Sequence, residues 1–119
     1  MKLRIQGDSI RLRLTRSEVH QLAEAGEVAA ETRVAPGSSL AYRLRTADRA
    51  GLGASLEGAG LTVSVPREWV VGWPDDERVG FEGTQDVGAG RQLALLVEKD
   101  FDCLHRRPDE TDLFPNPDA

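Results

Sequence analysis

The strongest constraint on the fold lies in the first fifteen residues, MKLRIQGDSIRLRLT, which have the pattern of a β-hairpin. Gly7-Asp8 is typical of a two-residue turn, because glycine tolerates a positive φ angle at the first central position. A turn at this point predicts five facing pairs: Gln6 with Ser9, Ile5 with Ile10, Arg4 with Arg11, Leu3 with Leu12, and Lys2 with Arg13. In that register one face is apolar and carries Leu3, Ile5, Ile10, Leu12 and Leu14. Turn and pattern agree, so this hairpin is expected to cover a hydrophobic core.

The same register gathers cations on the other face of the hairpin. The candidate anion-binding residues are Lys2, Arg4, Arg11 and Arg13, joined by Arg43 and Arg45 if their strand lies nearby. Like charges directly opposite one another across two strands are unfavourable, so we expect a negative partner. One interpretation is a site where guanidinium groups clamp a phosphate or carboxylate. The other is that the protein's own acids pair with these cations, from the acidic tail or from Glu27, Glu31, Glu57 and Glu82. The formal net charge of −5 favours the second interpretation.

The segment after the hairpin carries the signals of one helix. Thr15-Arg-Ser-Glu18 has the form of a capping box, and helical spacing of apolar residues continues to Ala25. Gly26 is a typical residue at the C-terminal end of a helix. We therefore expect an amphipathic helix directly after the hairpin.

Alternating residues and turn sequences predict further strands. We expect a hairpin over 28–45, a hairpin over 54–65, a short strand over 79–84, and a central strand over 93–97 that is buried on both faces because it lacks polar alternation. The predicted fold class is α+β: a single domain over residues 1–107, in which an antiparallel sheet, open or curled toward a barrel, packs against the helix. An acidic, proline-rich segment over 108–119 is expected to run as an extended tail.

Two tryptophans stand close together in the segment PREWVVGW. Pro66 is expected at the first position of a short helix that places Trp69 and Trp73 one turn apart, before Pro74 ends it. Tryptophans at this spacing can stack a ligand. In a chain with only 5% aromatic residues, core packing is the favoured interpretation.

The segment EKDFDCLH contains candidate metal ligands. In an extended chain, Cys103 and His105 point to the same side, as a metal pair requires. A zinc site needs about three or four ligands, and the sequence has no second cysteine and only His20 as a further histidine. A buried Cys103 beside a surface His105 is the simpler interpretation, and no orienting partner for a cysteine nucleophile is evident. Lys99, between two acids, is expected at a solvated strand end.

Four stretches resemble a family of small bacterial proteins of uncharacterised function. They are the opening hairpin, TRSEVHQLAEAG, PREWVVGW and the closing LLVEKDFDCLH…FPNP, and the resemblance covers nearly the whole chain. The resemblance implies a single intact domain from bacteria. It carries over no catalytic residue.

Several function classes are disfavoured by the sequence. No apolar run approaches the roughly 20 residues that span a bilayer, and the absence of an export signal together with a single cysteine favours the cytoplasm. The negative net charge and the lack of aromatics among the arginines argue against nucleic acid. We expect no cofactor. The main hypothesis is a non-catalytic module that binds another protein or assembles with itself. The alternative is binding or processing of a phosphorylated or polycarboxylate small molecule on the arginine-rich face.

Overall fold

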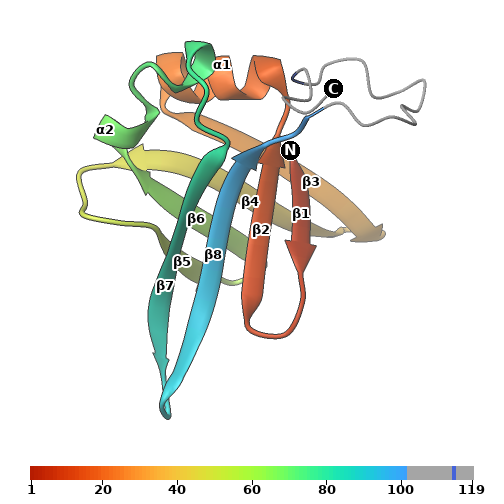
Figure 1. Cartoon of the computed structure of the whole chain (residues 1–119). Coiled ribbons are helices and arrows are strands. Elements are labelled where there is room, and N and C mark those ends of the chain that lie inside the picture. Colours follow the sequence, from red (N-terminus) through yellow and green to blue (C-terminus); the bar gives the residue numbers. More distant parts are fainter. Residues whose placement is uncertain (102–113, 115–119) are drawn as a thin grey trace.

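A computed structural model describes residues 1–101 and Phe114 of this chain, and these residues form two four-stranded sheets (Figure 1). The strands are β1 (Lys2–Ile5), β2 (Ser9–Leu14), β3 (Glu27–Ala35), β4 (Ser38–Ala47), β5 (Gly53–Glu57), β6 (Gly60–Pro66), β7 (Gly80–Gly88) and β8 (Arg91–Lys99). The helical elements are α1 (Arg16–Ala25), α2 (Arg67–Val70) and the 3₁₀ turn η1 (Trp73–Asp75). The α+β class and the positions of the predicted hairpins are confirmed. None of the described helices is long and apolar enough to cross a membrane.

The N-terminal hairpin adopts the predicted register. Arg4 pairs with Arg11 and Ile5 with Ile10, and the Gln6 amide donates to the Ser9 carbonyl at 3.0 Å across the turn. Gly7 has φ +54°, the left-handed conformation that the turn requires.

Helix α1 begins and ends where its capping residues predict. The Thr15 hydroxyl accepts from the Glu18 amide, and the Glu18 carboxylate accepts from the Thr15 amide at 2.9 Å. Gly26, at φ +81°, donates its N–H to the Leu22 carbonyl at 3.0 Å. The capping box and the glycine stop are both confirmed.

The expected antiparallel pairing is found in two sheets rather than one, and both sheets share one topology. The strand orders are β1-β2-β8-β7 and β3-β4-β6-β5. In each sheet two antiparallel hairpins are joined by a central parallel pair, β2 with β8 and β4 with β6. Strand alternation does not specify which strands become neighbours, so these parallel pairs were not predicted. The outer strands of both sheets keep free edges, so the described sheets do not close into a barrel.

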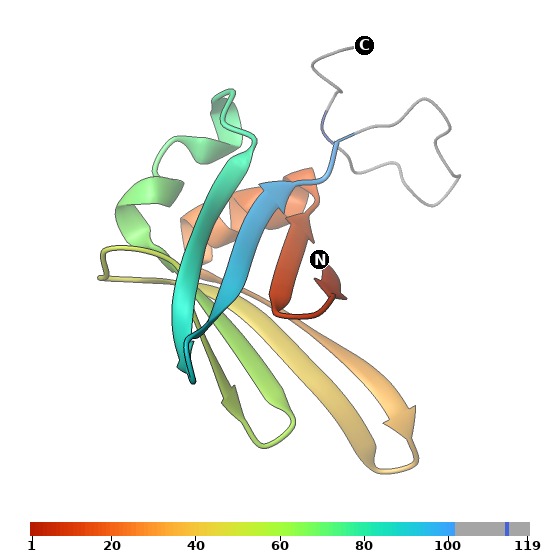
Figure 2. The same ribbon diagram turned by 60° about the horizontal axis from the view of Figure 1, so that its bottom comes forward.

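The core lies between the two sheets and beneath α1. The largest fully buried side chains in it include Leu12, Leu14, Val97, Leu44, Val63, Val65, Val19, Leu22 and Trp73. Helix α1 lies across one end of the sheets (Figure 1), and the sheets diverge toward the other end, where the β3–β4 hairpin projects (Figure 2). The sandwich is therefore covered by a helix at one end only.

Strand β8 is central, as predicted, but it is buried on one face. Leu95 and Val97 point into the core, whereas Ala94 is exposed and Leu96 is half-buried. The prediction of burial on both faces was wrong, because no described element covers the outer face of this sheet.

The helix that contains Trp69 is shorter than predicted and does not reach Trp73. Helix α2 ends at Val70, and Gly72 at φ +77° separates it from η1, which contains Trp73. Both tryptophans nevertheless pack on Phe81, with ring centroids 5.4 Å away for Trp69 and 4.8 Å for Trp73. The expected core role is confirmed for Trp73, which is fully buried.

Candidate functional site

The cationic face of the hairpin is partly neutralised by acids of the same chain. Arg11 and Arg13 both converge on Glu98 of β8, with Nε to Oε1 distances of 3.2 and 2.9 Å. The parallel pairing of β2 with β8 places Arg13 directly beside Glu98. Lys2 Nζ lies 3.0 Å from Oδ2 of the buried Asp100. Among the described residues, the internal carboxylates on this face are those of Glu98 and Asp100, at the end of β8.

Arg4 differs from the other cations of the hairpin. Its Nη2 donates to Gln6 Oε1 at 2.8 Å, and no described carboxylate forms an ion pair with it. Arg4 and Arg11 line a depression of about 220 Å³, which we call the Arg4–Arg11 depression. Its remaining lining residues are Gln6, Ser9 and Leu96. Two guanidinium groups from facing positions thus border one small polar hollow.

Arg43 and Arg45 lie apart from this depression. Both belong to β4, in the other sheet. Arg43 Nη1 is 3.5 Å from Glu27 Oε1, and Arg45 is exposed. Of the six candidate anion-binding residues, the structure brings together the four of the N-terminal hairpin.

Cys103 and His105, the candidate metal ligands, lie outside the described residues. Within the described part of the chain, no group of three or more histidine, cysteine, aspartate or glutamate side chains is placed to hold a metal.

Lys99 was predicted at a solvated strand end, and this prediction was wrong. Its residue exposure is 4%, and its Nζ donates to the Asp76 carbonyl at 2.7 Å. The ammonium group also lies 4.8 Å from the ring centroid of Phe114 and 5.8 Å from that of Trp73. Burial lowers the pKa of Lys99 from its ordinary value, because the charged form loses hydration. Because side chains alternate along β8, this long side chain points inward. Its hydrogen bond to the Asp76 carbonyl connects the end of β8 to the residue that follows η1.

An apolar cleft opens between the two sheets at the end away from α1. It has a volume of about 350 Å³ and is lined by Leu3, Ile5, Ile10, Leu40, Ala54, Ser55, Leu56, Leu61, Gln85 and Leu93. Ile10 and Leu61 form its buried floor, whereas Ile5 and Leu56 remain 60% and 70% exposed at its mouth. The sequence placed Leu3, Ile5 and Ile10 on one face of the hairpin. It did not indicate that the core would be open there.

Polar contacts join the two sheets on both sides of the cleft. On one side the Gln85 side-chain amide bonds the backbone of Ala54 twice: Oε1 accepts from the amide at 2.7 Å and Nε2 donates to the carbonyl at 2.9 Å. On the other side the Tyr42 hydroxyl donates to the Met1 carbonyl at 3.3 Å. These contacts therefore hold the two sheets together on either side of the cleft. Nothing in the sequence pattern distinguished Gln85 from other polar strand residues.

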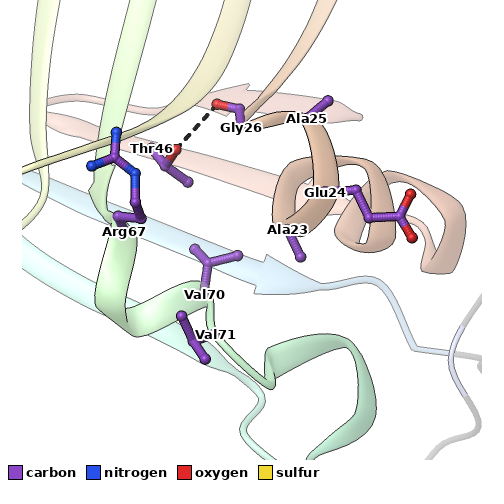
Figure 3. A pocket seen from close by; sticks show the side chains of 8 residues that line it. All are labelled: Ala23, Glu24, Ala25, Gly26, Thr46, Arg67, Val70 and Val71. Atoms are coloured by element: carbon purple, nitrogen blue, oxygen red, sulfur yellow. Dashed lines mark hydrogen bonds between the residues drawn. The ribbon is translucent and has the colours of Figure 1, made fainter.

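A third hollow, of about 490 Å³, lies between the C-terminal end of α1 and α2 (Figure 3). Its walls include Ala23, Val70 and Val71, and the charged groups of Glu24 and Arg67 point away from one another on opposite sides. The lining shown here brings no nucleophile beside a general base, so it offers no set for acid–base or nucleophilic catalysis.

The fold and its cleft define a small α+β domain built from two mixed sheets that remain open at one end. The model of the family described as "Family of unknown function (DUF7009)" matches residues 1–118, and the chain belongs to that family. This confirms the resemblance to an uncharacterised family over nearly the whole chain. No curated protein and no solved structure matches the chain.

Proposed function

We propose that this domain is a non-catalytic interaction module that assembles with a second copy of itself at the mouth of the apolar cleft. The observation that carries the proposal is the grouping of Ile5, Leu40 and Leu56, which are 60%, 36% and 70% exposed around one opening. Burying large apolar side chains is favourable by about 25 cal/mol per Å² of surface removed from water. Contiguous exposed apolar surface of this kind is typical of an interaction site.

The free edge of β3 favours a second copy as the partner. Gln21 Nε2 donates to the Glu27 carbonyl at 3.1 Å, which shows that this carbonyl points away from β4. Because alternate residues of a strand point the same way, Ala29, Glu31 and Arg33 also direct backbone N–H and C=O groups outward. Such an edge is a ready template for pairing with another strand.

The sequence of this edge is complementary to itself. Two antiparallel copies of β3 centred on Thr32 would place Glu31 of each opposite Arg33 of the other, giving two symmetry-related ion pairs. In the register of the sheet, Thr32 lies opposite Leu40, which lines the cleft. Pairing at this edge therefore brings the second copy beside the cleft mouth.

Two further observations support the other parts of the proposal. In the Arg4–Arg11 depression, the apolar cleft and the hollow between α1 and α2, no lining nucleophile lies beside a general base, which supports a non-catalytic role. The single cysteine leaves the chain without an internal disulfide, which supports a reducing compartment such as the bacterial cytoplasm.

Sedimentation equilibrium of the full chain tests the assembly. The wild type is expected to show a reversible monomer–dimer equilibrium, and Leu40→Asp is expected to weaken it at least about tenfold, because Leu40 lies beside β3 at the cleft mouth. The matched control is Val71→Asp, because Val71 is 73% exposed but lies away from the cleft. A wild type that stays monomeric up to about 1 mM, or equal weakening by both variants, refutes the proposal.

A charge exchange tests whether the partner is a second copy in this register. Glu31→Arg alone and Arg33→Glu alone should each weaken the dimer about tenfold, because facing pairs contribute about 0.2–1 kcal/mol and like charges repel. The double variant restores both pairs across the twofold axis and should recover wild-type affinity. If the double variant is as weak as the single variants, the β3 register is wrong.

A further inference from the structure

The outer face of the sheet β1-β2-β8-β7 carries an excess of positive charge at one place. Arg11 and Arg13 share a single carboxylate, that of Glu98, through the same oxygen. Arg4, directly opposite Arg11, has only the neutral amide of Gln6 as its bonded partner among the described side chains. This face is separate from the apolar cleft, which lies on the inner side of the same sheet.

The spacing of Arg4 and Arg11 suits a shared anion. Facing residues of a hydrogen-bonded antiparallel pair lie with their Cα atoms about 5.5 Å apart, so the two side chains leave the strands side by side. The Nε of Arg11 is engaged by Glu98, while Gln6 orients Nη2 of Arg4. Each guanidinium has five N–H donors in a planar fork, so donors remain on both groups after these contacts.

We propose that the Arg4–Arg11 depression is a binding site for a single oxyanion group, phosphate or carboxylate. Its volume of about 220 Å³ accommodates such a group, and an oxyanion placed there accepts from both guanidinium groups. Ser9 contributes a hydroxyl and Gln6 an amide to the same lining. The negative charge removes the repulsion between two cations that face one another across the hairpin.

The neighbouring surface restricts what the anionic group is attached to. A second depression, of about 580 Å³, adjoins the first through Ser9 and Leu96, extends over Ala94 and Thr84, and includes Glu82, which faces Leu96 across β7 and β8. Small side chains make its floor low, and the Glu82 carboxylate repels a second negative charge. The ligand class is therefore an uncharged body that carries one anionic group, rather than a polyanion.

NMR titration of the full chain with inorganic phosphate at low salt, followed on the arginine Nε–Hε signals, tests the site. Saturable shifts of Arg4 and Arg11 are expected, and Arg4→Gln should weaken binding about tenfold. The matched control is Arg45→Gln, which removes an equal charge from an exposed position on the other sheet and should change affinity less than twofold. The site is refuted if the shifts do not saturate or if both variants weaken binding equally.

Two further arms define the ligand. Parallel titrations with phosphate and acetate identify the preferred oxyanion: tighter phosphate binding indicates a phosphoryl group and tighter acetate binding a carboxylate. Glu82→Gln should strengthen binding of pyrophosphate at least twofold and leave that of acetate unchanged. Equal effects on both probes would overturn the assignment of a ligand with one anionic group. Substitutions that disrupt the dimer should leave the Arg4 and Arg11 signals unchanged. The oxyanion site and the dimer can therefore be refuted independently.

Discussion

Gln85 offers the sharpest test of how the two sheets are held together. Its side-chain amide satisfies both the N–H and the C=O of Ala54, at 2.7 and 2.9 Å, across the edges of β7 and β5. Each such hydrogen bond contributes about 1 kcal/mol net, and leaving a partly buried backbone group unpaired costs at least that much. Gln85→Ala removes both bonds and should lower the free energy of unfolding by about 2 kcal/mol.

Urea unfolding of the wild type and the variant measures this change. A domain of this size should also lose roughly 8 °C of midpoint temperature, at about 4 °C per kcal/mol. Gln92→Ala in β8 is the matched control, since it removes an exposed strand glutamine and should cost less than about 0.5 kcal/mol. A Gln85→Ala cost no larger than that of the control would show that the amide does not join the sheets.

Gln85→Glu separates the donor from the acceptor at the same position. A carboxylate keeps the bond from the Ala54 amide but cannot donate to the Ala54 carbonyl, and its charge repels that oxygen. The protonated acid can donate, so the pKa of this glutamate should lie above its unfolded value of about 4.3. The loss of stability relative to wild type is then fully present above the pKa of this glutamate in the folded protein, and it shrinks as the pH falls toward about 4. A deficit independent of pH would refute this account.

Two further predictions concern backbone approach and the buried lysine. Gly80→Ala should lower the free energy of unfolding by about 2 kcal/mol or more, because the added Cβ would meet the Val97 carbonyl oxygen. At Gly53 an added Cβ would meet only the flexible end of Arg49. Gly53→Ala should therefore cost less than about 1 kcal/mol in the same urea assay. Because burial lowers the pKa of Lys99, its protonated form costs stability below the folded pKa. Wild type should therefore gain stability relative to Lys99→Met as the pH rises toward 10.5, measured by urea unfolding at pH 7 and 10. The same difference in the free energy of unfolding at both pH values would contradict the lowered pKa of Lys99.

The local part of this fold could be predicted because its signals are local. The Gly7-Asp8 turn fixes the register of the first hairpin, and Thr15 and Glu18 close the start of α1 through bonds only three residues apart. Each of these features depends on neighbours in the sequence.

The pairing of strands could not be predicted in the same way. Arg13 and Glu98 are 85 positions apart in the sequence, and they meet only because β2 and β8 become parallel neighbours. Alternation assigns side chains to a face but leaves the adjacent strand unspecified. For the same reason the cationic face could be predicted, whereas the pairing of Arg11 and Arg13 with Glu98 could not. Lys99 was misplaced because a run of three charged residues at a strand end is usually solvated, and here alternation turns the middle one inward.

Both proposed sites originate in two consecutive residues of β1. Successive strand residues point to opposite faces, so Ile5 reaches the mouth of the cleft while Arg4 reaches the outer depression. A register shifted by one residue would exchange an apolar and a cationic surface, which means that the Gly7-Asp8 turn sets the positions of both. Energetic coupling between two sites requires an element with two discrete arrangements. This hairpin is held by its turn, by a full ladder to β2 and by the contact of Glu98 with Arg11 and Arg13. Oxyanion binding on one face should therefore leave self-association on the other unchanged, even though the two sites are one residue apart.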